Sequence, residues 1–150
     1  MNLKKTLTPE RVILGLPGKT KDDIIKNLVK LLCDTGDIKD RKGVLKAVKE
    51  REEQMSTGMK HGIGIPHGKT DAVDQLHACV VISKHPVDFD SLDGEPCRIF
   101  LMTLSPKAHT GPHLQFLAEV SGLLKKKEKR DQILQAKTKE ELLRILLDEN

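Results

Sequence analysis

Two short apolar runs set the tightest limit on what this chain can fold into. They cover residues 76–83 and 97–104, and each is apolar at positions that point to both faces of an extended strand. Successive side chains of a strand point to opposite faces, so such a strand must be covered on both sides. Both runs are far too short to cross a bilayer. They therefore predict central strands of a sheet that has helices on each face.

The N-terminal part of the chain supplies one strand and two helices for such a sheet. A short apolar run, Val12–Leu16, predicts a strand. Thr20 is a suitable N-cap for the helix that follows, and Gly36 is expected to end that helix in the left-handed conformation. Asp40 is expected to begin the second helix. The polar residues of this second helix are expected to face solvent: Lys46, Lys49, Glu50, Glu52 and Glu53.

The C-terminal part predicts further helices. Pro112 suits the first position of a helix, because its missing N–H has no intrahelical partner there. Thr138 and Glu141 form the pattern of a capping box for the last helix. The Pro112 helix is expected to face inward with Leu114, Leu117, Ala118, Ser121 and Leu124. Doubly buried strands flanked by groups of helices predict a mixed α/β (α+β) fold, a three-layer α/β/α sandwich around a mixed sheet, with residues 1–150 as one domain.

Composition argues against several classes of function. The formal net charge is only +4, and the chain has no Trp or Tyr that could stack on bases. We interpret the one dense basic run, residues 125–130, as a solvated helix end and expect no nucleic-acid partner. Cys33, Cys79 and Cys97 form no CxxC or CxxH pattern, so we expect buried thiols rather than a zinc site or disulfides. No segment has the pattern of a signal peptide or membrane anchor, so a cytoplasmic protein without membrane insertion is expected.

Residues 56–70, S-T-G-M-K-H-G-I-G-I-P-H-G-K-T, contain the side chain that best suits a chemical role. Glycine permits tight turns and close approach to a ligand, and Pro66 stiffens the backbone before His67. His113 lies in the first turn of the Pro112 helix, where unpaired backbone N–H groups attract anions. If both histidines meet, His67 could take a phosphoryl group on one ring nitrogen while a backbone acceptor holds the other N–H.

A phosphoryl group carries about two negative charges and needs hydrogen-bond donors. His113, the helix N-terminus and Arg51 could supply them. Arg51 leads into the glycine-rich stretch, and its planar guanidinium matches phosphate oxygens. Phosphoryl transfer depends mainly on positioning and charge stabilisation. The chain has no Gly-rich nucleotide-binding motif, so we expect no cofactor.

The residues alone leave two other interpretations open. His67 could be only the polar tip of an irregular loop. The histidines His61, His67, His109 and His113 could instead hold a metal ion. Against a metal site, no carboxylate or cysteine lies at ligand spacing, and Pro112 is expected to place His109 outside the helix.

The chain also resembles a known family. Its segments R-E-E at 51–53, S-T-G at 56–58 and G-I-G-I-P-H-G-K at 62–69 are similar to the motif of the fructose/mannitol-type IIA domains (PTS EIIA type 2). These domains belong to the bacterial phosphoenolpyruvate:sugar phosphotransferase system and include the nitrogen-regulatory IIA proteins. The resemblance covers nearly the whole chain, including V-D-F at 87–89, H-L at 113–114 and residues 136–142. It implies a three-layer fold with a mixed central sheet.

The resemblance also implies roles and partners. His67 matches the histidine that accepts phosphate from phospho-HPr, His113 the second active-site histidine, and Arg51 an arginine that contacts the phosphoryl group. The implied next acceptor is a cysteine of a IIB domain, during sugar uptake. The alternative role is a stand-alone nitrogen-type regulator, in which the phosphorylation state of His67 controls partner proteins. A binding module that has lost the phosphate relay is a third possibility, against which the three intact residues argue.

The sequence departs from the family pattern at two places. Gly64 stands where alanine is usual, a change that is small in size. Met59-Lys60-His61 replaces the common I-G-N. This second departure is expected to put a lysine and an extra histidine beside the site, with an effect on partner choice or phosphohistidine lifetime whose direction the sequence does not give.

Overall fold

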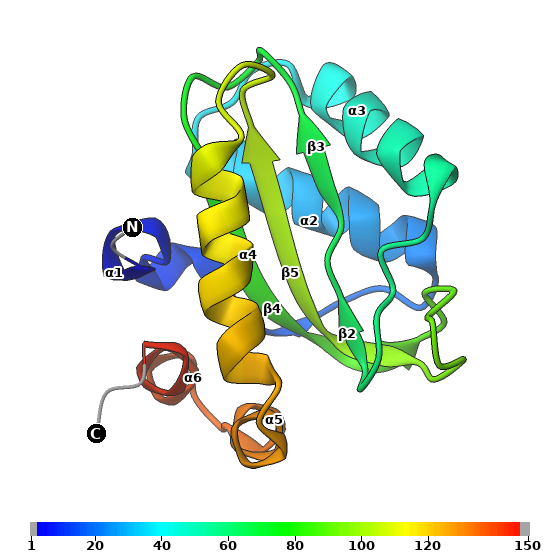
Figure 1. Cartoon of the computed structure of the whole chain (residues 1–150), viewed down its shortest axis with the longest axis vertical. Coiled ribbons are helices and arrows are strands. Elements are labelled where there is room, and N and C mark those ends of the chain that lie inside the picture. The colour runs from blue at the N-terminus through cyan, green and yellow to red at the C-terminus, as the bar shows by residue number, and fades with distance from the viewer. Residues whose placement is uncertain (1–2, 148–150) are drawn as a thin grey trace.

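A five-stranded mixed sheet lies at the centre of the computed structural model, which describes residues 3–147 (Figure 1). Within these residues the strands are β1 (Val12–Leu16), β2 (Ile63–Gly64), β3 (His67–Lys69), β4 (His77–Val87) and β5 (Cys97–Ser105). β4 and β5 pair antiparallel, β1 runs parallel to β4, and β2 and β3 both run parallel to β5. The predicted mixed sheet is confirmed, and the two apolar runs are its central strands.

Helices cover both faces of this sheet, as Figure 1 shows. A short α1 (Leu3–Thr6) and a 3₁₀ turn (Pro9–Arg11) precede β1. One face carries α2 (Lys21–Thr35) and α3 (Arg41–Gln54). The other face carries α4 (Gly111–Leu124), α5 (Lys127–Gln135) and α6 (Lys139–Leu146). The predicted α/β/α sandwich is therefore confirmed.

The alternation of side chains along β4 divides the core between the two faces. Cys79 and Val81 join the buried cluster beneath α2 and α3, whereas Ala78 and Val80 join the cluster beneath α4, α5 and α6. All four are fully buried, which is the arrangement that a doubly apolar strand requires. The three cysteines are buried and free, as expected. Within the described residues, no helix is both long and apolar enough to cross a membrane.

The predicted N-caps are confirmed by their hydrogen bonds. The Thr20 hydroxyl accepts from Asp23 N at 3.1 Å, Asp40 Oδ1 from Gly43 N at 3.0 Å, and Thr138 Oγ1 from Glu141 N at 3.0 Å. The predicted end of α2 is wrong in one detail. Gly36 has an ordinary φ of −96°, and the left-handed position, φ 52°, falls on the next residue, Asp37. Aspartate tolerates that conformation, because its short polar side chain can hydrogen-bond locally.

The inward face predicted for α4 is right for Leu124 and for the partly buried Leu117 but wrong at the start of the helix. Leu114 is 62% exposed, and the buried residues are His113, Phe116, Val120 and Leu124. The helix is thus turned so that its first-turn histidine, rather than the following leucine, packs on β5. The sequence pattern could not predict which side of the helix faces the sheet, because apolar residues occur on most sides of it. A histidine is also not one of the apolar residues from which an inward face is predicted.

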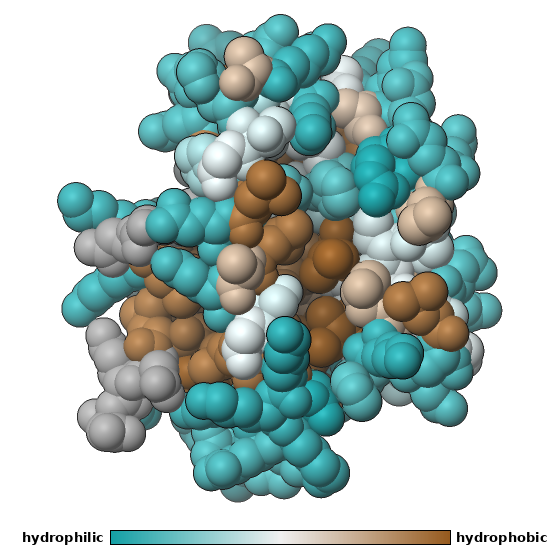
Figure 2. Space-filling model, in the orientation of Figure 1, coloured by the Kyte–Doolittle hydropathy of each residue, from teal (hydrophilic) through white to brown (hydrophobic). Residues whose placement is uncertain are grey.

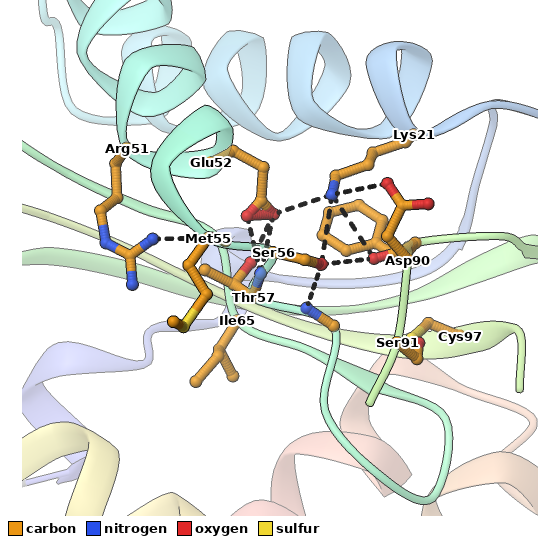
Figure 3. A network of polar contacts seen from close by, with 12 residues as sticks. Lys21, Arg51, Glu52, Met55, Ser56, Thr57, Ile65, Asp90, Ser91 and Cys97 are labelled. Carbon is orange, nitrogen blue, oxygen red and sulfur yellow. Dashed lines mark hydrogen bonds and ion pairs between the residues drawn. The ribbon is translucent and has the colours of Figure 1, made fainter. Parts of the chain in front are cut away.

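The expected outward position of Glu52 is the third error. The residue is only 7% exposed, and its side chain points from α3 toward the turn that follows the helix (Figure 3). Both of its carboxylate oxygens accept hydrogen bonds from Thr57. A buried carboxylate needs such partners, because the loss of hydration is costly.

The basic run at residues 125–130 ends one helix and begins another, in keeping with its interpretation as a helix end. Arg130 Nη1 donates to the carbonyl oxygens of Leu124 and Lys125, at 2.8 and 3.0 Å. These carbonyls lie at the C-terminus of α4, where a cation also complements the helix dipole. Lys127 pairs with Asp131 on the same helix.

Candidate functional site

His67 is the first residue of β3, and its side chain is held by the backbone just before it. His67 pairs in register with Thr103 of β5. Its Nδ1 lies 3.1 Å from the carbonyl oxygen of Ile65. A carbonyl oxygen only accepts hydrogen bonds, so Nδ1 carries the proton and Nε2 keeps a free lone pair. This is the backbone contact that the proposed chemistry requires.

The surroundings of His67 keep its ring neutral. Partial burial lowers the pKa of His67 below its ordinary value, and the charges of Arg51 and Lys69 lower it further. The hydrogen bond to Ile65 and the carboxylate of Glu52 act in the opposite direction but do not outweigh them. At neutral pH the imidazole is therefore an uncharged nucleophile.

His113 lies against the ring of His67, which is the condition on which the proposed chemistry depends. The ring centroids are 5.0 Å apart, with an interplanar angle of 36°. His113 Nδ1 lies 2.7 Å from the hydroxyl of Thr103. A threonine hydroxyl can donate this hydrogen bond, which leaves the Nε2–H of His113 as a donor for an anion. The residue is only 5% exposed.

Burial also explains the charge state of His113. It lowers the pKa of His113 to about 4, and the neighbouring His67 and Lys69 contribute in the same direction. His113 is thus neutral at physiological pH. It can act on an anionic group as a hydrogen-bond donor rather than as a cation.

Arg51 lies near the C-terminus of α3 and faces the same cavity as His67. Its Nη1 donates to the carbonyl oxygen of Met55 at 2.8 Å (Figure 3). Among residues 3–147 the guanidinium makes no other hydrogen bond or ion pair, so most of its donors remain available. Arg51 reaches the cavity of His67 because α3, which carries Arg51, packs tightly on β3, which begins with His67. A Cβ on Gly68 would lie 2.9 Å from the Val48 side chain, so only glycine permits this approach.

The cavity beside His67 has a volume of about 570 Å³ and an excess of positive charge. Its lining residues are Gly43, Lys46, Ala47, Glu50, Arg51, Gln54, His67, Lys69, Thr70 and Lys107. Four of these side chains are cationic and only Glu50 is anionic, so the cavity favours an anion such as a phosphoryl group. His113 is not among the lining residues, and its ring lies against that of His67. His67 therefore shares the cavity with Arg51 and contacts His113 through its ring, but Arg51 and His113 do not line the same cavity.

The Met59-Lys60-His61 segment lies in a different place from the one expected. Lys60 and His61 line a second, apolar cavity of about 360 Å³ rather than the cavity of His67. Figure 2 shows apolar side chains gathered in this region of the surface, over α4 and β2. The remaining lining residues are Met59, Ile63, Ile65, Leu92, Leu101, Ser121, Leu124 and Lys125. His61 has a φ of 65°, a conformation in which Asn, Asp and His are enriched, so histidine can replace asparagine there.

Sequence reasoning missed four polar residues around the site. Lys69 and Lys107 add charge to the cavity, while Thr103 and Thr57 hold side chains in place. Thr103 carried a signal, because a hydroxyl within a doubly buried strand needs a partner. The others carried none, because the residue pattern does not show which way their side chains turn in the folded chain. In the described part of the chain, no group of three or more His, Cys, Asp or Glu side chains could hold a metal ion.

Fold and site together describe a domain with a neutral, anchored imidazole beside a cationic cavity. The family model "Phosphoenolpyruvate-dependent sugar phosphotransferase system, EIIA 2" matches residues 5–149. The chain therefore belongs to the PTS EIIA type 2 family, and the resemblance seen in the sequence is confirmed.

Known proteins of two kinds are similar to the chain. The fructose-specific EIIA component of the PTS from Haloferax volcanii is 38% identical over 144 residues, which cover 95% of this chain and 94% of that protein. The crystal structure of nitrogen regulatory protein IIA-Ntr from Neisseria meningitidis aligns with a TM-score of 0.87 and 27% identity, covering 96% of this chain and 98% of that one.

A third similar protein was solved together with a partner. It is the mannitol IIA enzyme of Escherichia coli, whose structure was determined in complex with phosphorylated IIB. The TM-score is 0.79 with 18% identity, covering 93% of this chain and 95% of that one. At this identity the similarity shows the fold.

Proposed function

We propose that the chain is a phosphoryl-carrier IIA component that accepts phosphate from phospho-HPr on His67 and passes it to a IIB cysteine for sugar uptake. The observation that carries this proposal is the hydrogen bond from His67 Nδ1–H to the carbonyl of Ile65. It leaves Nε2 as the nucleophilic nitrogen of a residue that lines a cationic cavity. Membership of the PTS EIIA type 2 family supports the same role.

In the first transfer, the lone pair of His67 Nε2 attacks phosphorus. An N–P bond forms on His67, the N–P bond to the HPr histidine breaks, and that nitrogen keeps the electron pair. His67 retains its Nδ1 proton, and the Ile65 carbonyl stabilises the positive charge that develops on the ring. Arg51 and Lys69 line the cavity and are placed to stabilise the transferred oxygens, and His113, whose ring lies against that of His67, is the third donor that we propose for them.

In the second transfer, a thiolate of IIB attacks the same phosphorus. A P–S bond forms, the N–P bond breaks, and the electron pair returns to Nε2. The low pKa of His67 suits it to this step, because a neutral imidazole is a good leaving group. The mannitol IIA structure solved with phosphorylated IIB supports a IIB domain as the acceptor.

A second candidate function is regulatory. The similarity to the Neisseria IIA-Ntr structure favours a stand-alone protein whose partners respond to the phosphorylation of His67. The 38% identity to a fructose-specific component favours transport. The two functions share the first transfer and differ in the second. Transfer of label from the phosphorylated chain to a IIB domain supports transport, and its retention in the presence of every available IIB domain supports regulation.

The first transfer is tested by incubation with phosphoenolpyruvate, enzyme I and HPr. We expect the wild-type chain to gain an acid-labile, base-stable phosphate and His67→Ala to gain none. His85→Ala is the matched control, and it should label like the wild type. An unlabelled wild-type chain, or full labelling of His67→Ala, contradicts the proposal.

A further inference from the structure

A chain of hydrogen bonds leads from Glu52, on α3, to the ring of His67. Glu52 Oε1 accepts from the Thr57 hydroxyl at 2.6 Å, and Oε2 accepts from Thr57 N at 2.8 Å. The carbonyl of Thr57 accepts from Ile65 N at 3.0 Å. The carbonyl of Ile65 accepts from His67 Nδ1 at 3.1 Å. Thr57 and Ile65, each through its own N–H and its own carbonyl, thus connect a carboxylate to the ring nitrogen opposite Nε2.

The members of this chain are fixed rather than mobile. Glu52 and Thr57 are 7% and 3% exposed. Lys21 lies 3.5 Å from Glu52 Oε1 and balances its charge, and it also contacts Ser56 Oγ, the Phe89 carbonyl and Asp90 (Figure 3). The turn that contains Thr57 is therefore held from α2, α3 and the loop after β4 at the same time.

The role of Glu52 in the structure is not explained by stability alone. A carboxylate taken out of water is a costly way to hold a turn, even where a hydrogen-bonded residue and a lysine offset part of the cost. The carboxylate binds the one residue whose carbonyl holds Ile65, and Ile65 is the residue whose carbonyl selects the His67 tautomer. The preceding residue on α3 is Arg51, which faces the cavity of His67. Two adjacent residues of α3 therefore act on the site: Arg51 lines the cavity, and Glu52 holds the turn behind His67.

We propose that Glu52 is a positioning residue for His67: through Thr57 and Ile65 it fixes the Nδ1–H tautomer and directs the free lone pair of Nε2 toward the cavity. This role rests on the proposed phosphoryl transfer. Its structural part, the choice of tautomer, stands independently of any phosphate donor. The negative charge of Glu52 also favours the positive charge that develops on the ring during transfer.

The test uses Glu52→Gln, with Glu53→Gln on the exposed side of α3 as the matched control. Nitrogen-15 NMR of the His67 ring is expected to show a protonated Nδ1 and a bare Nε2 in the wild type and in Glu53→Gln. In Glu52→Gln we expect the two ring shifts to move toward each other as the tautomers mix. Phosphorylation by phospho-HPr is expected to slow on the order of tenfold, the effect of about one hydrogen bond to a charged group.

A second pair of variants decides the question if Glu52→Gln does not fold. Thr57→Val removes the hydroxyl and keeps the backbone N–H, so it should shift the tautomer balance in the same direction, and Thr57→Ser should restore it. A folded Glu52→Gln or Thr57→Val protein with the wild-type ring shifts and rate overturns the proposal. A wild-type chain that takes no phosphate contradicts the function proposed above instead, and the ring shifts still decide the role of Glu52.

Discussion

At the scale of single residues, the site depends on two histidines that are both kept uncharged, for related reasons. His67 is neutral because of partial burial and nearby cations, and its tautomer is set by Ile65. His113 is neutral because it is almost fully buried against Thr103. The first can therefore act as a nucleophile and the second as a neutral hydrogen-bond donor. Neither property was visible in the spacing of the residues.

The burial of His113 predicts a pH dependence of stability. In the unfolded chain His113 takes up a proton near pH 6.5, whereas in the folded protein its pKa is about 4. The unfolded state binds more protons between these values, so the free energy of unfolding falls as the pH drops from about 6.5 toward 4. Urea denaturation at several pH values measures this.

His77 is also partly buried and has a lowered pKa, so it adds to the same pH dependence of stability. The variant His113→Gln separates the contribution of His113 from that of His77. The difference in unfolding free energy between wild type and His113→Gln should shrink or reverse as the pH falls through this window. A difference that stays constant from pH 7 to pH 4 would show that His113 titrates normally in the folded protein.

At the scale of elements, close packing of short strands brings the site residues together. Gly64 of β2 lies directly over Phe100 of β5, where an added Cβ would be 2.8 Å from the ring. Phe100 is fully buried, so its ring cannot turn out into solvent. The glycine at the usual alanine position is thus matched to a large neighbour, and the exchange is not the minor change in size that the sequence indicated.

This packing predicts that Gly64→Ala destabilises the protein by about 1–3 kcal/mol, the usual cost of overpacking. Combining it with Phe100→Leu should recover part of that loss, so that the two effects are not additive. Gly122→Ala is the control. It adds a Cβ in open space on a helix and should be neutral or stabilise by about 0.5–1 kcal/mol. Thermal or urea unfolding measures the wild type, the single variants Gly64→Ala, Phe100→Leu and Gly122→Ala, and the double variant, and a neutral Gly64→Ala would contradict the packing.

At the scale of the whole molecule, the sequence predicted the central sheet and most of the helices that pack on its two faces. β1 has the predicted bounds, and the two doubly apolar runs became the paired central strands β4 and β5. These predictions succeeded because they depend on local patterns: two-sided burial of a strand, and caps such as Thr20 and Thr138. The meeting of His67 and His113 was predicted as a condition of the chemistry and is present.

The parts that sequence patterns could not predict are those set by tertiary contacts. Glu52 looks like a solvent-facing residue of a polar helix, and only the position of Thr57 shows that it is buried. The rotation of α4 depends on His113 packing on β5, which no spacing of leucines reveals. Lys69 and Lys107 reach one cavity from separate loops and strands. In each case the deciding contact depends on how the backbone turns or packs between the two residues, even for Glu52 and Thr57, which are only five residues apart.

The central claim is that Nε2 of His67 carries the phosphoryl group, and the position of the N–P bond tests it most directly. We would phosphorylate the nitrogen-15-labelled protein with phospho-HPr and record the nitrogen–phosphorus coupling in the histidine rings. The predicted result is a coupling to Nε2 of His67, with Nδ1 still protonated. A coupling to Nδ1 of His67, or to a nitrogen of His113, would contradict it.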